Sequence, residues 1–292
     1  MKVAFVVNAR EKERYVEQAV RGALSQTYQC EVLLSDQGSK DKTFSLMRDM
    51  ADVYTDQVGI HKIRLLQCPV VGPYGMRAMN THMAWLVQQT DADFLFQSSA
   101  DDFSLPDRVK VCMEAVAEHP CSAVATTMWF ANPGDTDLKS VSGYPTESGY
   151  VSPGEGLKNL AFGSTIAGYR RDFLLQVCES VGANTPDVFF GFLASLMDGF
   201  YVVAEPHHVH QTVADSQNTG FQGKLRAAEG NMALKVAECN HYQLGRLYQS
   251  LAREVQRLQI KIKEEDWIAL MDMIIGQAFA WSDARTVLHE KE

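Results

Sequence analysis

Acidic side chains follow two short apolar segments in the first part of the chain. Asp36 comes directly after residues 31–35, and Asp101 and Asp102 follow residues 94–97. Carboxylate oxygens are hard ligands that suit magnesium or manganese. Both places also have a plain structural interpretation, because aspartate before Gln-Gly-Ser is ordinary turn chemistry and an aspartate pair can cap a helix. Whether these aspartates bind a ligand or only stabilise local structure therefore depends on the strands and helices around them.

Strand-like apolar segments alternate with helix-like segments up to residue 110. The strand-like segments are residues 3–7, 31–35, 62–67 and 94–97, and the helix-like segments are residues 15–24, 43–53 and 77–88. This alternation predicts right-handed βαβ units and an α/β fold with a mostly parallel, Rossmann-like central sheet and flanking helices. Ligands of such sheets bind at the carboxyl ends of the strands. Asp36 and Asp101 lie at two of these ends, which makes them the first candidates for a binding site.

The rest of the chain is less regular. Residues 123–130 are strand-like, and residues 132–156 are rich in Gly, Pro and Ser. From residue 224 to residue 292 the pattern is helical, with no strand-like segment. We therefore expect an α/β domain over residues 1–223 and an all-helical C-terminal segment over residues 224–292.

The composition argues against several classes of protein. With 292 residues, 46% of them apolar, the chain can form a full core, and its formal net charge of −9 opposes binding to nucleic acid or membrane surfaces. No apolar run reaches the ~18 residues that a membrane span needs. The six cysteines show no zinc-type spacing. We expect a cytoplasmic protein without a membrane span, whose thiols are buried and reduced.

Four segments together resemble glycosyltransferase family 2. They are VAFVVNAREKERYVEQAVRGALSQTY (residues 3–28), VLLSDQGSKDKT (residues 32–43), GMRAMNTHMA (residues 75–84) and DADFLFQSSADDFSLPDR (residues 91–108). They are similar, in order and spacing, to that family's first strand and helix, its Asp-Gly-Ser turn, its glycine-to-asparagine segment and its DxD metal signature. The resemblance implies the GT-A fold, with a nucleotide-binding half over residues 1–110 and an acceptor half over residues 111–223.

The resemblance also implies an activity. It is the transfer of a sugar from a nucleoside diphosphate, with a UDP-sugar as the favoured donor, by inverting single displacement. A Mn²⁺ or Mg²⁺ ion would stabilise the diphosphate leaving group. The QxxRW signature of processive synthases is absent, so we expect a non-processive enzyme.

Individual roles are carried over by position. Asp36 would contact the base and Asp101 would bind the metal. In the segment of residues 185–206, Asp187 falls at the position of the general base that takes a proton from the acceptor hydroxyl. The alternative is that Pro186 and Asp187 simply start a helix, because proline and acidic residues favour its first turn. Further donor-site candidates are Asn8, Ala9, Arg10, Gly75, Asn80, Ser99 and Ala100, and candidates for acceptor or phosphate contacts are Asp102, Arg170 and Arg171.

Several positions depart from the family pattern or leave alternatives open. Ser99 replaces the first aspartate of DxD, which predicts weaker metal binding. His208 and His210 follow the strand-like residues 201–205 and share one strand face, so either could be a metal ligand. For the arginine pair at residues 170–171 a solvated helix start is as reasonable as a phosphate contact.

The C-terminal segment carries an apolar stripe on one helix face. Arg246, Arg253 and Arg257 lie in a narrow arc on the other side. A solvated face is the plain interpretation, and the helices would also allow oligomers. The sharper alternative is a surface for a polyanionic acceptor such as DNA. A glycan or a small molecule would also be possible acceptors.

Two other classes of protein stay open. The first is a sugar-nucleotide binding module without catalysis, which Ser99 favours. The second is a nucleotidyltransferase, but such enzymes have a Gly-rich loop after the first strand, and residues 8–10 do not supply it.

Overall fold

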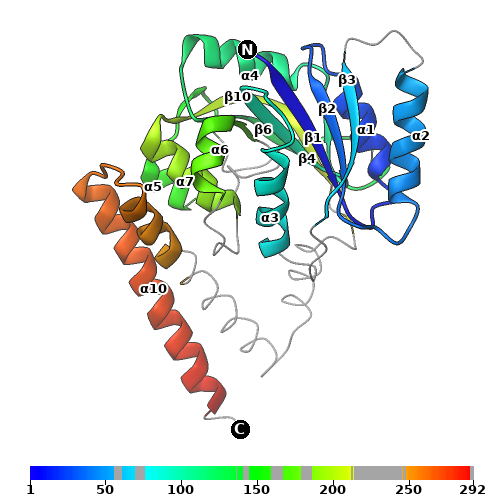
Figure 1. Cartoon of the computed structure of the whole chain (residues 1–292). Helices are drawn as coiled ribbons and strands as arrows, with labels where there is room; N and C mark the ends of the chain where they lie inside the picture. Colours follow the sequence, from blue (N-terminus) through cyan, green and yellow to red (C-terminus); the bar gives the residue numbers. More distant parts are fainter. Residues whose placement is uncertain are drawn as a thin grey trace.

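The structure is a computed structural model. It describes residues 1–55, 61–69, 76–135, 137–140, 145–158, 167–178, 186–211, 213, 245 and 248–289. In this part of the chain one twisted sheet lies between helices that cover both of its faces (Figure 1).

The sheet is mixed and mostly parallel in its N-terminal half. Its strands are β1 (Val3–Ala9), β2 (Glu31–Asp36), β3 (Lys62–Gln67), β4 (Phe94–Ser99), β5 (Phe103–Ser104), β6 (Ala123–Ala131), β7 (Lys139–Ser140), β8 (Gly149–Tyr150), β9 (Ala167–Arg170) and β10 (Phe200–Gln211). They lie in the order β3-β2-β1-β4-β9-β6-β10-β5, with β7 paired to β6 and β8 to β10. The first four and the β6–β10 pair are parallel, whereas β9 runs antiparallel to β4 and β6.

Helices connect the strands as the sequence predicts. They are α1 (Val16–Leu24), α2 (Thr43–Thr55), α3 (Met76–Leu86), α4 (Arg108–Glu118), α5 (Pro153–Lys158), α6 (Arg171–Val177), α7 (Pro186–Met197) and α10 (Glu264–His289). The order β1-α1-β2-α2-β3-α3-β4 confirms the predicted alternation of strands and helices. The α/β class with flanking helices is therefore confirmed.

Side chains of β1 show that both faces of the sheet are covered. Phe5 and Val7 pack in a core with residues of α1, α2 and α4, whereas Ala4 and Val6 pack in a second core with residues of α6 and α7. All four are fully buried. A continuously apolar strand is what a parallel sheet buried on both faces requires.

One close contact positions the chain that follows β4. A Cβ atom at Gly22 in α1 would lie 2.9 Å from the backbone nitrogen and oxygen of Ser104 in β5. Only glycine allows α1 to come this close. The helix thereby fixes the segment that directly follows Asp101 and Asp102.

The strand β10 is longer than the sequence predicts. It continues beyond residue 205, so His208 and His210 lie within the strand and not after it. Its register with β6 shifts between Val203 and Pro206 and again between Pro206 and His208. Because proline has no N–H to donate, this irregularity lets the strand pass Pro206 and resume pairing.

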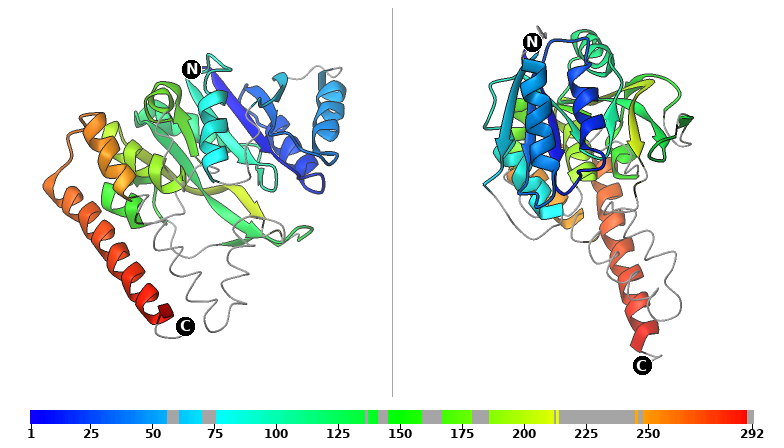
Figure 2. Two further views of the ribbon diagram at one scale, coloured as in Figure 1. Left: turned by 60° about the horizontal axis from the view of Figure 1, so that its bottom comes forward. Right: turned by 90° about the vertical axis from the view of Figure 1, so that its right-hand side faces the viewer.

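Residues 248–257 and α10 are helical, which confirms the expected helical structure for these two segments. Leu251, Val255 and Leu270 are buried in the core that contains α7, and α10 extends away from the sheet (Figures 1 and 2). The predicted boundary at residue 224 lies outside the described residues. Within the part that the structure describes, no helix is both long and apolar enough to cross a membrane.

The cysteines agree with the expectation of buried thiols. Cys30, Cys68, Cys112, Cys121 and Cys178 are buried and free, and Cys239 lies outside the described residues. Burial raises the pKa of the Cys112 and Cys178 thiols to about 12, so they stay protonated.

Candidate functional site

The carboxyl ends of three neighbouring strands meet at one edge of the sheet. In the register of the sheet Ala9 of β1 lies beside Asp36 of β2, and Asn8 of β1 lies beside Ser99 of β4. The amide N–H of Ala100 donates to the carbonyl oxygen of Asn8 at 2.9 Å. The structure therefore brings together the predicted residues that follow β1, β2 and β4.

Asp36 has one carboxylate oxygen in a turn and one without a partner. Its Oδ2 accepts hydrogen bonds from the backbone N–H groups of Gly38 at 2.9 Å and Ser39 at 3.0 Å. Gly38 has φ 77°, a backbone conformation that favours glycine. Its Oδ1 is buried and has no hydrogen-bond partner among the described residues. The turn interpretation is correct for Oδ2, while Oδ1 remains available to a ligand, since an unpaired buried acceptor is costly.

The loop after β1 is held against the loop after β2. The amide N–H of Lys12 donates to Thr43 Oγ1 at 2.7 Å, and that of Glu11 donates to Ser39 Oγ at 2.8 Å. Glu11 has φ 53°, a left-handed conformation that costs free energy in a non-glycine residue. These contacts hold a strained backbone at the edge of the sheet and direct the next side chain, Lys12, inward.

Lys12 forms an ion pair with Asp101. Lys12 Nζ lies 3.0 Å from Asp101 Oδ2, and only 7% and 11% of the two side chains are exposed. Ser99 Oγ donates to the other oxygen, Oδ1. Both oxygens of the predicted metal ligand therefore have partners from this chain. Lys12 is not among the residues predicted from the sequence, because it lies in a run of charged residues that is typical of solvated surface.

Asp102 faces β10. Its Oδ1 accepts a hydrogen bond from the N–H of Gln211 at 2.9 Å and lies 3.0 Å from His210 Nδ1. Its Oδ2 lies 3.5 Å from His208 Nε2. Burial by itself would raise the pKa of the Asp102 carboxyl, but its interactions with His208 and His210 outweigh burial and hold that pKa well below its usual range. Asp102 is therefore an ionised group that connects the segment after β4 to residues of β10.

A buried arginine supports His208 from the other side. Arg108 Nη1 donates to Ser104 Oγ at 2.8 Å and to the carbonyl oxygen of Gln97 at 3.1 Å, and it lies 3.3 Å from His208 Nδ1. Burial lowers the pKa of His208 to about 4, so the ring is neutral. Its Nδ1 then accepts from Arg108, and its proton is on Nε2, which faces Asp102. Arg108 is also not among the residues predicted from the sequence, where its only signal is its place after the Pro-Asp of the DxD segment.

The two predicted histidine ligands differ in exposure. The His208 side chain is fully buried between Arg108 and Asp102, whereas the His210 side chain is 29% exposed and packs edge-on against Phe130. His210 is the one that reaches the surface of the site.

The residues at this edge do not fit the divalent cation that the resemblance implies. Ser99 supplies no carboxylate, Asp101 is paired with Lys12, and Asp102 is held by β10. Among the residues that the structure describes, no group of three His, Cys, Asp or Glu side chains is arranged to hold a metal ion. Metal binding through Asp101 Oδ2 would have to displace Lys12.

Other predicted residues lie at the edge or outside the described part. Asn8 Nδ2 donates to Gln97 Oε1 at 3.0 Å, and Ala9 accepts the N–H of Gln37 through its carbonyl oxygen at 2.9 Å. Arg10 follows directly in the loop. Gly75 lies outside the described residues, and of Asn80 only the helical backbone is described. Asp187 is at the predicted helix start in α7, and its side chain is likewise outside the described part.

The arginine pair lies at the opposite edge of the sheet. Arg170 pairs with Phe94, the first residue of β4, because β9 runs antiparallel to β4. Its guanidinium contacts Asp172 and Asp198, and Arg171 Nε donates to the carbonyl oxygen of Val87. The pair therefore lies at the end of β4 opposite to Asp36 and Asp101, and it begins α6, as the alternative interpretation of a helix start predicts.

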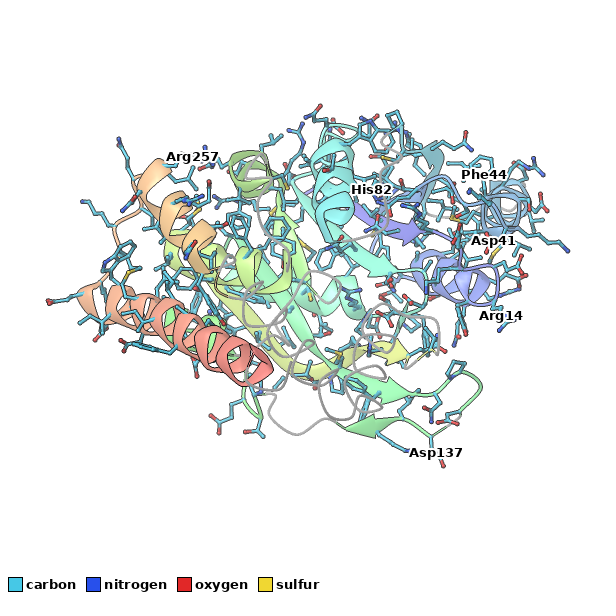
Figure 3. All side chains as sticks on the ribbon, turned by 90° about the horizontal axis from the view of Figure 1, so that it is seen from below. Arg14, Asp41, Phe44, His82, Asp137 and Arg257 are labelled. Carbon is cyan, nitrogen blue, oxygen red and sulfur yellow. The ribbon has the colours of Figure 1, made fainter. Side chains whose placement is uncertain are left out.

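The C-terminal arginine stripe is partly used in packing. Arg257 donates to Glu254 at 2.7 Å and to the carbonyl oxygen of Gln176 at 2.8 Å, and Arg246 lies outside the described residues. Figure 3 shows Arg257 at the opposite end of the molecule from Arg14 and Asp41, which belong to the loops of the site. Arg257 is therefore not part of the candidate site.

The mostly parallel sheet with polar residues at the carboxyl ends of its strands is typical of α/β proteins that bind ligands at this edge, and comparison with known proteins gives the family. The sequence matches glycosyl transferase family 2 over residues 4–177, more than half of the chain, so the protein belongs to this family. This confirms the resemblance of the four segments. A comparison with curated proteins found no match.

Solved structures share the fold. S. aureus TarS 1-349 in complex with UDP-GlcNAc has a TM-score of 0.59 and 14% identity, over 99% of this chain and 84% of that chain. A mannosyltransferase from Pyrobaculum calidifontis in complex with GDP-Man and Mn²⁺ has a TM-score of 0.52 and 15% identity, over 99% of this chain and 83% of that chain. At these identities the likeness shows the GT-A fold and no more.

Proposed function

We propose that this protein transfers a sugar from a nucleoside diphosphate donor to an acceptor hydroxyl, with inversion and one transfer per encounter. Family membership supports the reaction class. The observation that carries the proposal is the unpartnered, buried Oδ1 of Asp36 at the same edge of the sheet as the Lys12–Asp101 pair. A base that donates an N–H and a diphosphate that needs positive charge are complementary to these two neighbouring features.

A UDP-sugar is the donor that we favour. Uracil and guanine both carry an N–H that a carboxylate can accept, and the two structural neighbours were solved with UDP-GlcNAc and with GDP-Man. Asn8, Ala9 and Arg10 border Asp36 on the adjacent strand and loop, so they are the residues that we expect beside the base and ribose.

Asp187 is the proposed general base. It lies in the first turn of α7, where the N–H groups of a helix stabilise a carboxylate. In the reaction the acceptor oxygen forms a bond to the anomeric carbon, and the bond from that carbon to the diphosphate oxygen breaks. The acceptor proton goes to Asp187, and the electron pair of the broken bond leaves with the nucleoside diphosphate.

A ligand screen tests the donor class. We expect UDP, GDP or one of their sugars to raise the free energy of unfolding by about 2.7 kcal/mol at 100 times its dissociation constant. Asp36→Asn should abolish most of this stabilisation, and Asp198→Asn, at the opposite edge of the sheet, should keep it. Stabilisation only by nucleoside triphosphates would favour a nucleotidyltransferase, and no stabilisation by any nucleotide would refute the donor assignment.

Donor hydrolysis separates an enzyme from a binding module. A transferase without its acceptor commonly transfers the sugar slowly to water, so we expect the wild-type protein to release nucleoside diphosphate from the matching donor. Donor binding without release, in the presence of a broad set of acceptors, would favour the non-catalytic module. DNA as acceptor has no support from the arrangement of Arg257, which is engaged within the chain.

A further inference from the structure

The Lys12–Asp101 pair lies where this class of enzyme would need a cation. Asp101 follows β4 at the edge that also carries Asp36, and Lys12 Nζ is 3.0 Å from its Oδ2. Lys12 comes from the loop after β1, the strand that lies between β2 and β4. A positive charge is thus built into the middle of the edge at which we place the donor.

A contribution to folding stability does not by itself explain why a buried Lys12–Asp101 ion pair is present. Removing two charges from water costs about as much as their attraction returns, and apolar side chains of similar size would serve packing as well. Yet the chain fixes the pair from several directions. Ser99 Oγ holds the second oxygen of Asp101, and the N–H of Lys12 is bonded to Thr43 Oγ1 at 2.7 Å. The strained backbone of Glu11, with φ 53°, precedes it.

A divalent cation is disfavoured by the same arrangement. Ser99 removes one carboxylate from the site, and the ammonium group of Lys12 occupies one oxygen of Asp101. A cation on that oxygen would meet a like charge at short range. The local charge and the number of available ligands therefore both favour the Lys12 ammonium group over a divalent cation at Asp101.

We propose that the ammonium group of Lys12 is the resident cation of the donor site and contacts the diphosphate in place of a divalent metal. This inference rests on the proposed function. Asp101 is then a positioning residue that holds the ammonium group. When the bond between the anomeric carbon and the diphosphate oxygen breaks, the leaving group gains one negative charge and Lys12 donates an N–H to it. Lys12 keeps its proton, the acceptor proton still goes to Asp187, and no co-reactant is needed.

Binding measurements on the full chain test the proposal. UDP and GDP are titrated calorimetrically against the wild-type protein in excess EDTA and again with Mn²⁺, with uridine and guanosine as ligands that lack the diphosphate. We expect the affinity for the preferred diphosphate to change less than about twofold between EDTA and Mn²⁺. Loss of binding in EDTA and its recovery with Mn²⁺ would overturn the proposal, and this arm needs no variant.

Variants of Lys12 then test whether its ammonium group is the positive charge that binds the diphosphate. Lys12→Met keeps the apolar stem, and we expect it to weaken diphosphate binding about 10-fold to 100-fold while nucleoside binding stays within about twofold. Lys110→Met, which changes an exposed lysine of α4, is the matched control and should bind like wild type. Lys12→Arg, which keeps the charge, should recover part of the affinity. Wild-type diphosphate binding by Lys12→Met would also overturn the proposal.

A double variant distinguishes a loss of folding from a loss of diphosphate binding. If Lys12→Met unfolds because Asp101 is left buried and unpaired, the double variant Lys12→Met/Asp101→Asn removes both charges and should fold. We expect the same loss of diphosphate affinity in it, and wild-type affinity would refute the role of Lys12. If wild type binds neither diphosphate in EDTA nor with Mn²⁺, the proposed function itself has failed, a result distinct from metal-dependent binding.

Discussion

Acid should destabilise this protein between pH 6.5 and 4 through two buried histidines. His82 and His208 are 2% and 0% exposed, and burial lowers the pKa of each ring to about 4. An unfolded histidine titrates near 6.5. In this range the unfolded chain binds more protons than the folded chain, so stability is fully present above pH 6.5 and is lost as the pH falls.

His82 is the better of the two for a test, because it lies outside the site. At pH 5.0 an unfolded ring is almost fully protonated and a ring with a pKa of about 4 is almost neutral, so one such histidine costs about 2 kcal/mol relative to pH 7.5. His82 Nε2 lies 2.7 Å from Ser35 Oγ, and glutamine can replace this hydrogen bond. We expect His82→Gln to lose about 2 kcal/mol less than wild type over the same change of pH.

Urea unfolding at pH 7.5 and 5.0 measures this difference. Ser35→Ala is the matched control: it removes the hydroxyl but leaves the ring buried, so the variant should be less stable at both pH values with the pH dependence of wild type. The carboxyl groups whose pKa is lowered, such as Asp102 and Glu31, lose their contribution mainly at lower pH. An equal acid-induced loss in His82→Gln and wild type would refute the reasoning from burial.

Further predictions concern the general base, the donor site, the contact between α1 and β5, and DNA binding. Asp187→Asn cannot accept a proton, so turnover should fall by ~10² to 10⁴ while calorimetry shows unchanged donor binding; wild-type turnover would move the base elsewhere, with His210 next. Asp36→Asn keeps an oxygen for its turn but loses the free carboxylate oxygen, so nucleoside binding should weaken about 10-fold or more by calorimetry. Gly22→Ala forces apart α1 and β5 and should cost about 1–3 kcal/mol in urea unfolding. Arg253→Gln should leave gel shifts with duplex DNA unchanged at every salt concentration, because we expect no binding by wild type.

The sequence by itself determined the class of fold and the ends of the strands. Alternating apolar segments predicted the order of strands and helices through β4, and the polar residues that follow β2 and β4 pointed to Asp36 and Asp101. This succeeds because buried parallel strands leave a local pattern, and because the carboxyl ends of such strands must share one edge.

Only the tertiary structure decided which side chains meet at that edge. Lys12 and Asp101 are far apart in sequence and meet because β1 and β4 are neighbours, and Arg108 reaches His208 because α4 packs beside β10. The direction of a strand is equally invisible in the residue pattern: since β9 runs antiparallel to β4, Arg170 is carried to the edge opposite the site. Local sequence encodes periodicity and turns, whereas pairing partners and strand direction depend on long-range packing, which no short segment contains.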